Sequence, residues 1–262
     1  MAEPSAGAGA ISSPDLLLAD LHLPVVACGA APEASFLNEA FLRFCAGPAR
    51  SARRVFLLGD VFESWVGDDL GLADYPREVA ALRALCDSGV EVLYQTGNRD
   101  FLLGAAFAKA SGARALPDEQ VENLGGIATL LAHGDQFCTE DLAYQRWRRF
   151  SRNRLAQWLF LKLSANRRRR IGGGLRDGSS SAKRSKAAAI MDVNDEAVVS
   201  AFRRHRVSRL IHGHTHRPAT HEHPMASGTA QRIVLADWRP DRLEWLHVDA
   251  AGWRRECLPS PQ

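Results

Sequence analysis

The stretch Leu210-Ile211-His212-Gly213-His214-Thr215-His216 decides how the chain is interpreted. The segment from Val207 to Ile211 predicts a buried strand, and three histidines follow it at alternate positions. Gly213 lets the backbone turn sharply and come close to a group bound by the imidazoles. Alternate side chains share one face of a strand, so all three histidines would align only if the chain stayed extended. A turn at Gly213 would send two of them into one pocket, which predicts a metal site at a strand end.

Four further predicted strands also end in polar loops. These loops carry Asp20 and His22 after residues 15–19, Asp60 after 54–58, Asn98, Arg99 and Asp100 after 90–95, and His133 after 128–132. Helical periodicity separates the strands, at residues 33–45, 76–88, 105–110 and 194–205. Strands interleaved with helices predict a largely parallel α/β layer, whose strands have their carboxyl ends at one edge. All five loops are therefore expected to converge on one crevice.

The residue types in these loops indicate metal chemistry. Carboxylates, an amide carbonyl and neutral imidazoles, without a thiolate, suit two hard or borderline divalent ions. A bridging aspartate can hold two such ions about 3.5–4 Å apart, with a water between them acidic enough to attack phosphorus. Any one such loop is more often structural than catalytic. The presence of five of them in one chain, each directly after a predicted strand, favours a catalytic site.

Composition restricts the class of protein. The chain has 262 residues, of which 46% are apolar and 24% charged, as in globular proteins. It has no apolar run near the ~20 residues needed to cross a bilayer, and residues 1–10 lack the features of a signal peptide. We therefore expect a cytoplasmic protein. Five cysteines without close pairing argue against a disulfide framework or a thiolate zinc site.

Positive charge is concentrated in one segment. Between Leu142 and Arg170 there are nine arginines and Lys162, with no acidic residue, although the net charge of the chain is only +3. Aromatic and leucine side chains are interspersed with these charges, as in a helix that lies at a membrane surface. The alternative is a helix that packs its apolar side on the main domain. An RNA-binding patch would need a recognised RNA module, which is lacking, so no nucleic-acid partner is expected.

The five loops in this order resemble the calcineurin-like metallophosphoesterases, over about residues 15–240. The motifs of that family are Asp-x-His, Gly-Asp, Gly-Asn-His-Asp, His and Gly-His-x-His. The resemblance implies an αββα sandwich with two metal ions. By motif position, the first ion would be held by Asp20, His22, Asp60 and His216. The second would be held by Asp60, Asn98, His133 and His214, with Asp60 as the bridge.

One position departs from that pattern. Many members have histidine after the asparagine, as a proton donor to the leaving alkoxide, whereas this chain has Arg99. Arginine does not give up a proton usefully, but its guanidinium binds phosphate well. A leaving group that needs no proton is therefore expected, and a phosphate is one. This favours cleavage of a pyrophosphate over hydrolysis of an ordinary phosphomonoester.

Longer motifs look like those of one branch, the UDP-2,3-diacylglucosamine hydrolases of lipid A biosynthesis. They are residues 59–69, 97–103, 133–139, 190–194 and 212–218. The resemblance implies a peripheral membrane enzyme of the bacterial inner membrane that uses two Mn²⁺ ions. It would hydrolyse UDP-2,3-diacylglucosamine at the α-phosphorus to UMP and 2,3-diacylglucosamine 1-phosphate. Carried over by position, the catalytic residues would be Asn98, Arg99 and His214, and the substrate contacts Asn98, Arg99, Asp141, Ser179, Lys183, Lys186 and His214. Lys183 stands where the family often has asparagine, so its role stays open.

Residues 1–14 are small and polar, with Pro4 and Pro14, and are expected to form a disordered tail. The resemblance implies that residues 15–137 and 191–262 form the phosphoesterase core and that residues 138–190 form a helical cap over the site. Residues 232–238 and 242–248 are expected to be closing antiparallel strands, and the protein is expected to be a monomer. Two alternatives remain at this stage. One is a soluble phosphodiesterase or pyrophosphatase acting on other nucleotides, and the other is a metal-free scaffold of the same fold that binds proteins.

Overall fold

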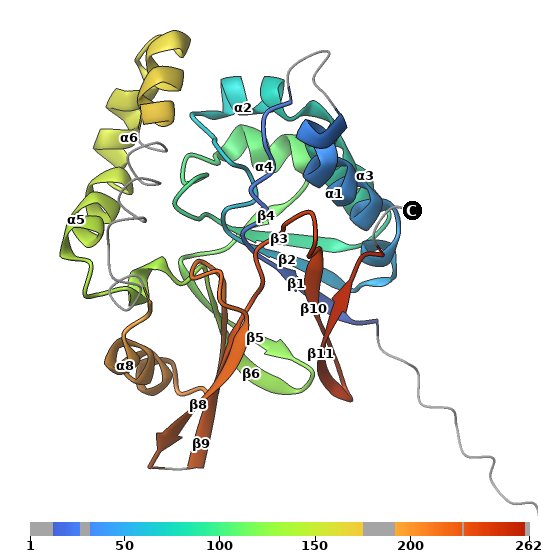
Figure 1. Ribbon diagram of the computed structural model, residues 1–262, viewed down its shortest axis with the longest axis vertical. Helices are drawn as coiled ribbons and strands as arrows, with labels where there is room; N and C mark the ends of the chain where they lie inside the picture. Colours follow the sequence, from blue (N-terminus) through green and yellow to red (C-terminus); the bar gives the residue numbers. More distant parts are fainter. Residues whose placement is uncertain (1–12, 27–31, 175–191, 227, 260–262) are drawn as a thin grey trace, which may run out of the picture.

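Two β-sheets pack face to face, with helices on their outer faces, in the computed structural model (Figure 1). The structure describes residues 13–26, 32–174, 192–226 and 228–259. The six-stranded sheet has the order β11 (Gly252–Cys257), β10 (Glu244–Asp249), β1 (Asp15–Leu18), β2 (Arg54–Leu58), β3 (Glu91–Gln95) and β4 (Arg114–Ala115). The five-stranded sheet has the order β5 (Glu119–Leu124), β6 (Ile127–Ala132), β7 (Arg209–His212), β9 (Gly228–Val234) and β8 (Ala219–Met225).

Strands β1, β2, β6 and β7 are apolar on both faces because each sheet is covered on both sides. In β1, Leu16 and Leu18 pack outward under helices, while Leu17 faces the space between the sheets. In β7, Leu210 packs outward and Ile211 packs inward. Alternate side chains of a strand point to opposite faces, so a strand buried on both faces reads as an unbroken apolar run. The protein therefore has four layers, in the order helix, sheet, sheet and helix, with an apolar core between each pair of neighbouring layers.

Helices cover the outer faces. On the six-stranded sheet lie α1 (Phe36–Ala46), α2 (Asp68–Asp74), α3 (Pro76–Asp87) and α4 (Ala105–Ser111), and on the five-stranded sheet lies α8 (Asp195–His205) (Figure 1). The helix ends follow from local chemistry. The Asn194 side chain accepts a hydrogen bond from the Ala197 amide at the start of α8, and Pro76 occupies the first turn of α3. Short 3₁₀ segments lie at Pro32–Ser35, Pro48–Ser51 and Asp135–Phe137.

A helical column stands to one side of the sheets and is called the cap below (Figure 1). It consists of α5 (Leu142–Ser151), α6 (Arg154–Leu161) and the helical residues 165–174. The Asn153 side chain accepts hydrogen bonds from the amides of Leu155 and Ala156, and so caps the start of α6. No described helix is long and apolar enough to span a bilayer.

The αββα sandwich implied by the family resemblance is confirmed, but two expectations based on local pattern were wrong. The strands do not form one parallel layer, because their double-sided burial requires a second sheet rather than helices on both faces. Residues 232–238 and 242–248 do not pair with each other. β9 pairs with β7 and β8, while β10 pairs with β1 and β11 in the other sheet. Hydrophobic pattern identifies strands but not their partners.

Residues 1–12 of the expected tail and residues 175–190 of the expected cap lie outside the described residues, as does Cys28. The other four cysteines, Cys45, Cys86, Cys138 and Cys257, are free thiols, as expected.

Candidate metal centre

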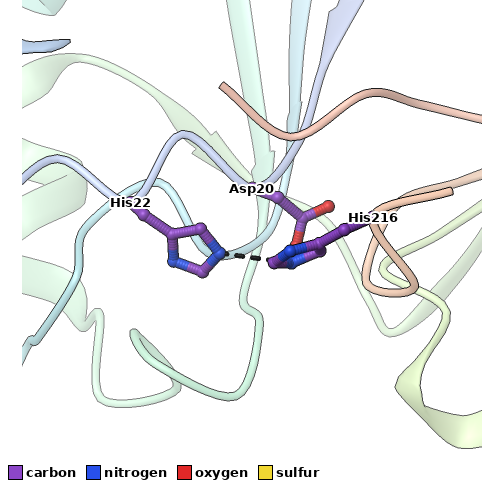
Figure 2. A group of neighbouring side chains, drawn as sticks. All are labelled: Asp20, His22 and His216. Carbon is purple, nitrogen blue, oxygen red and sulfur yellow. Dashed lines mark hydrogen bonds and ion pairs between the residues drawn. The ribbon is translucent and has the colours of Figure 1, made fainter. Parts of the chain in front are cut away.

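The loops after β1 and β7 bring three predicted ligands together, although they come from different sheets. Figure 2 shows Asp20, His22 and His216 pointing toward one another. The Nε2 atoms of His22 and His216 are 3.3 Å apart, and His216 Nε2 lies 3.3 Å from Asp20 Oδ1. Ligand atoms of the three residues all fall within 4.8 Å of one another.

A second group adjoins the first and is formed by Asp20, Asp60 and His133, whose ligand atoms again lie within 4.8 Å of one another. Asn98 Oδ1 is 3.5 Å from His133 Nε2, and the rings of His133 and His214 are 5.0 Å apart. All seven predicted ligands therefore gather at one edge. Asp20 belongs to both compact groups, whereas the family pattern implies Asp60 as the bridging residue.

Two glycines permit this close approach. A Cβ atom on Gly213 would lie 2.2 Å from Asp20 Oδ2, and one on Gly97 would lie 2.1 Å from Asp60 Oδ1. Any side chain at either position would push a predicted ligand loop away. Gly213 was expected to allow a sharp turn, but the residues with positive φ are its neighbours His214 (φ 68°) and His216 (φ 55°). Its role is to let the β7 loop contact the β1 loop.

The backbone of the site is held in a costly conformation. Asp20, His22 and Asp60 have φ of 55°, 46° and 52°, in the left-handed region that side chains other than glycine rarely adopt. The loops support each other, because the Asp20 amide donates to the Gly59 carbonyl and the His22 amide to the Asp60 carbonyl, both at 3.0 Å. Such strain persists where the surrounding structure fixes it, as is common in active sites.

Burial and charge set the protonation of the site. Burial lowers the pKa of His214 to about 4, so this imidazole is neutral at pH 7 and has a lone pair available. Burial also disfavours the charged form of His133, but the carboxylates of Asp60 and Asp20 outweigh it and raise the pKa of His133. Burial raises the pKa of Asp100 to about 6, and the nearby Asp60 carboxylate adds to the rise. The site concentrates negative charge that a cation would compensate.

These residues fit a divalent metal ion. The donor set is carboxylate, amide oxygen and imidazole nitrogen. Two nitrogen ligands of one ion lie about 3.0–3.5 Å apart, because each is about 2.1 Å from the metal. The 3.3 Å between the Nε2 atoms of His22 and His216 agrees with this spacing.

Neighbouring side chains orient the predicted ligands. Glu63 Oε2 is 3.3 Å from His22 Nδ1, and Asp237 Oδ2 is 3.5 Å from His216 Nδ1. Asp100 accepts hydrogen bonds from the amides of Val61 and Gly97, and so ties the Asp60 loop to the Asn98 loop. Sequence reasoning missed Asp237, which follows β9 without a motif of its own. His212 is fully buried, and its Nδ1 lies 2.8 Å from the Gly213 carbonyl, away from the ligand group.

A pocket of about 780 Å³ opens beside the ligand group. Its polar side includes the predicted substrate contacts Asn98, Arg99, Asp141 and His214. Its apolar side includes Phe101, Leu102, Tyr144, Trp147, Phe150 and Phe160. Ser179, Lys183 and Lys186, predicted to complete the substrate site, lie outside the described residues.

The basic residues of the cap divide into two sets. Arg148, Arg152, Arg168 and Arg169 form ion pairs with acidic residues of the body of the protein. The other six, Arg146, Arg149, Arg154, Lys162, Arg167 and Arg170, are exposed. Exposed apolar side chains lie among the second set, with Leu155, Trp158 and Leu159 each more than half exposed. The mixture of basic and apolar residues in this segment thus produces both ion pairs that attach the cap to the body of the protein and an exposed amphipathic surface.

Two facing sheets between helical layers, with acidic, amide and imidazole groups gathered where their strands end, define a metallophosphoesterase. No family model matches the chain. Curated UDP-2,3-diacylglucosamine hydrolases of Escherichia coli O6:K15:H31 (strain 536 / UPEC) and Shigella sonnei (strain Ss046) are each 46% identical to it over 226 residues, 86% of this chain and 91% of theirs. The chain belongs to the UDP-2,3-diacylglucosamine hydrolase family.

Solved structures align with most of the chain at low sequence identity. A dimetal phosphatase from Danio rerio is 16% identical, with a TM-score of 0.46 over 95% of this chain and 100% of its own. An archaeal phosphodiesterase is 10% identical, with a TM-score of 0.46 over 94% of this chain and 99% of its own.

Proposed function

We propose that this protein hydrolyses the pyrophosphate bond of UDP-2,3-diacylglucosamine. Water adds to the α-phosphorus, the bond from that phosphorus to the bridging oxygen breaks, and the products are UMP and 2,3-diacylglucosamine 1-phosphate. The observation that carries the proposal is the 46% identity to UDP-2,3-diacylglucosamine hydrolases across 91% of their length. The pocket supports it, because its polar end adjoins the candidate metal ligands and its aromatic side is suited to acyl chains.

Two divalent ions, with manganese as the proposed metal, would be held by the seven predicted ligands. Asp20, His22, Asp60 and His216 would hold one ion, and Asp60, Asn98, His133 and His214 the other. Bound ions of this kind supply positive charge to phosphate oxygens and lower the pKa of a water molecule. Asn98 and His214 line the pocket as well, which supports the proposal that both contact the substrate phosphate.

Arg99 is the proposed clamp on the pyrophosphate. Its guanidinium lies 3.3 Å from Glu63 Oε1, and its side chain is largely buried at the pocket wall. Glu63 therefore fixes both Arg99 and His22. A planar guanidinium binds phosphate oxygens in a fixed geometry, and a leaving phosphate needs no proton from it.

The cap would bind the lipid part of the substrate and place the enzyme on the membrane. Leu155, Trp158, Leu159 and Leu161 are exposed on α6, and the Lys162 ammonium lies 5.4 Å from the centre of the Trp158 ring. An amphipathic helix with exposed aromatic, leucine and basic residues suits an anionic membrane surface. We propose a monomer bound peripherally at the cytoplasmic face of the inner membrane, with residues 138–190 as its lid.

Hydrolysis in H₂¹⁸O tests the reaction and its position together. Purified protein with Mn²⁺ should release UMP that carries ¹⁸O, while the lipid 1-phosphate stays unlabelled. Label in the lipid product would place the attack at the other phosphorus. Release of product from a cyclic nucleotide, with the lipid left intact, would instead favour a soluble phosphodiesterase. An intact lipid with every divalent ion tried would exclude the proposal.

A further inference from the structure

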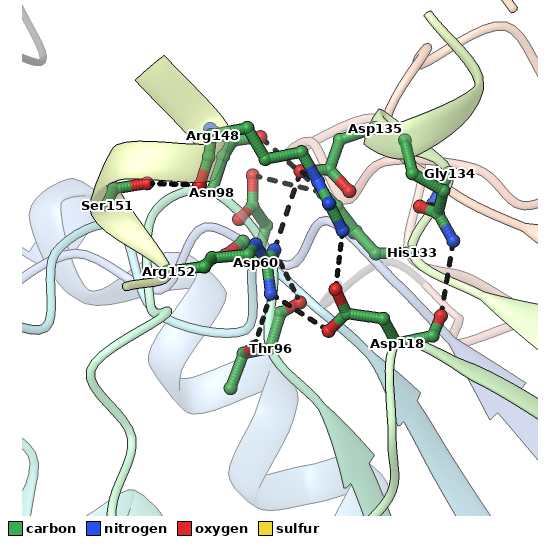
Figure 3. A network of polar contacts seen from close by, with 12 residues as sticks. Asp60, Thr96, Asn98, Asp118, His133, Gly134, Asp135, Arg148, Ser151 and Arg152 are labelled. Atoms are coloured by element: carbon green, nitrogen blue, oxygen red, sulfur yellow. Dashed lines mark hydrogen bonds and ion pairs between the residues drawn. The ribbon is translucent and has the colours of Figure 1, made fainter. Parts of the chain in front are cut away.

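Three side chains of α5 and its C-terminal cap reach the edge of the candidate metal centre. Tyr144 and Arg148 lie in α5 and Arg152 directly follows it, and because the three are spaced four residues apart they share one side of the helix. The Tyr144 ring lies 5.9 Å from the His214 ring, and its hydroxyl donates to Asp135 Oδ2 at 2.7 Å. The two arginines extend into the polar network in Figure 3. This face of α5 is therefore part of the structure that supports the site.

Arg152 contacts the loop that carries Asn98. Its Nη1 donates to Thr96 Oγ1 at 3.1 Å, and its Nη2 donates to the carbonyls of Thr96 and Gly97 at 3.3 Å each. These two carbonyls immediately precede Asn98 in the loop after β3. A guanidinium with a fixed donor geometry thus holds the backbone next to a predicted ligand.

The same guanidinium contacts the other sheet. Nη1 donates to Asp118 Oδ1 at 3.0 Å, just before β5, and Nη2 lies 3.4 Å from Asp135 Oδ2, two residues after His133. Arg148 reinforces this side, because it donates to Asp135 at 2.9 Å and to Asp118 at 2.6 Å. Asp135 is fully buried, so its pairs with Arg148 and Arg152 are shielded from solvent, whereas the Asp118 side chain is 47% exposed.

One side chain of the cap therefore joins the two loops whose ligands must meet. Asn98 follows a strand of the six-stranded sheet and His133 a strand of the five-stranded sheet, and their ligand atoms are 3.5 Å apart. Buried hydrogen bonds also join the two sheets at the strand ends, from Gln95 Nε2 to the Leu131 carbonyl at 3.1 Å and between His133 Nδ1 and the Leu58 carbonyl at 2.9 Å, and Arg152 adds contacts to the loop backbone beyond them. Metal affinity depends on such outer contacts, whose loss typically weakens binding about 10–100-fold.

We propose that Arg152 is a positioning residue that sets the spacing of Asn98 and His133 and couples the cap to the metal centre. The inference rests on the proposed two-metal site. Arg152 touches neither substrate nor metal in this role. It acts through the backbone of residues 96–97 and through Asp135.

Manganese binding by the full chain tests the proposal without use of the lipid. In Arg152→Met, which keeps the side-chain length but has no donors, one of two Mn²⁺ ions should bind about 10–100-fold more weakly, while the other binds as in the wild type. Arg152→Lys should recover part of the lost Mn²⁺ affinity, because an ammonium group keeps the positive charge but not the planar set of donors of a guanidinium. Arg149→Met is the matched control, since Arg149 is an exposed residue of the same helix whose Nε donates to the Gln145 carbonyl.

Amide exchange in EDTA-treated protein gives a second measurement. Peptides covering residues 96–99 and 133–137 should exchange faster in Arg152→Met than in Arg149→Met, with the rest of the chain unchanged. Two ions bound with wild-type affinity in Arg152→Met would overturn the inference while the metal site stands. Faster exchange throughout the chain would overturn it too, because Arg152 would then support the whole fold. A wild-type chain that binds no Mn²⁺ would remove both proposals.

Discussion

Arg168 of the cap forms a two-pronged ion pair with Asp69 of α2, in which Nη1 is 2.8 Å from Oδ1 and Nη2 bonds Oδ2. Nη1 also donates to the Val66 carbonyl at 2.7 Å, and Arg168 is only 4% exposed. The cap is thus anchored at its far end through Arg168 and at its near end through Arg148 and Arg152. The pocket lies between these two anchors.

Loss of the far anchor should loosen the cap over the pocket. Arg168→Gln is expected to raise the KM for the lipid about fivefold with little change in kcat, which corresponds to about 1 kcal/mol. Steady-state kinetics on Arg168→Gln, Asp69→Asn and the double variant would measure it. The double variant should be no worse than the more impaired single variant, and additive losses would show that the two residues act separately.

Removal of the Asp60 carboxylate should eliminate catalysis. Asp60 Oδ1 already accepts the Arg99 amide at 2.8 Å, so Asp60→Asn keeps the loop contact but removes the charge that a metal needs. Metal content by elemental analysis should fall below two ions per chain, and kcat should fall about 10³-fold or more. Asp87→Asn, an exposed change at the end of α3, should alter neither quantity. Full activity in Asp60→Asn would contradict the ligand assignment.

Catalytic efficiency should depend on the planar shape of the Arg99 guanidinium as well as on its charge. Arg99→Lys keeps the positive charge but loses the planar donors that face Glu63 and the pocket. We expect kcat/KM to fall about 10²-fold, with metal content unchanged. Glu63→Gln should lower kcat/KM by a smaller factor, because Arg99 remains but is less well held. Equal activity of Arg99→Lys and the wild type would show that a point charge is sufficient.

The exposed face of α6 should bind anionic membranes. Replacing Trp158 and Leu159 together by serine is expected to reduce sedimentation with phosphatidylglycerol vesicles several-fold, because both side chains are 54% exposed and would otherwise enter the interface. Val121→Ser, at an exposed position of β5 away from the cap, serves as the control. Unchanged sedimentation of the double variant would rule out α6 as the membrane contact.

Asp15 should make a pH-dependent contribution to stability. Burial raises its pKa, but hydrogen bonds from Arg54 and Arg53 outweigh this effect, so its folded-state pKa is lowered. The contribution is therefore present above the unfolded-state pKa of about 3.9 and is lost as pH falls through the lower folded-state value. Asp15→Asn should lower the free energy of unfolding by about 3 kcal/mol at pH 7. Urea unfolding from pH 7 to pH 3 should show this difference shrinking below about pH 4. A difference that is constant with pH would mean that the ion pairs are not its source.

Much of this architecture could be predicted from local sequence. The apolar runs before Asp20, Asp60 and His133 each form a strand, and the polar loops follow where expected. Residues that set the boundaries of helices affect only the few positions next to them, as Pro76 and Asn194 do at the starts of α3 and α8. The αββα arrangement itself came from the motif resemblance, because alternation along one strand does not say whether a helix or a second sheet covers its face.

Sequence alone therefore determined the strands, their polar ends and the kinds of ligand, because each depends on residues close together in the chain. Only the tertiary structure decided which strands became neighbours and which distant side chains met. His22 and His216 approach across 194 positions, Asp237 lies beside His216, and Arg152 contacts the loop of Asn98, and no motif marks Asp237 or Arg152. Such contacts depend on how two sheets pack and how a cap docks. That packing is set by the sum of many weak apolar contacts over the whole chain, and no short segment encodes it.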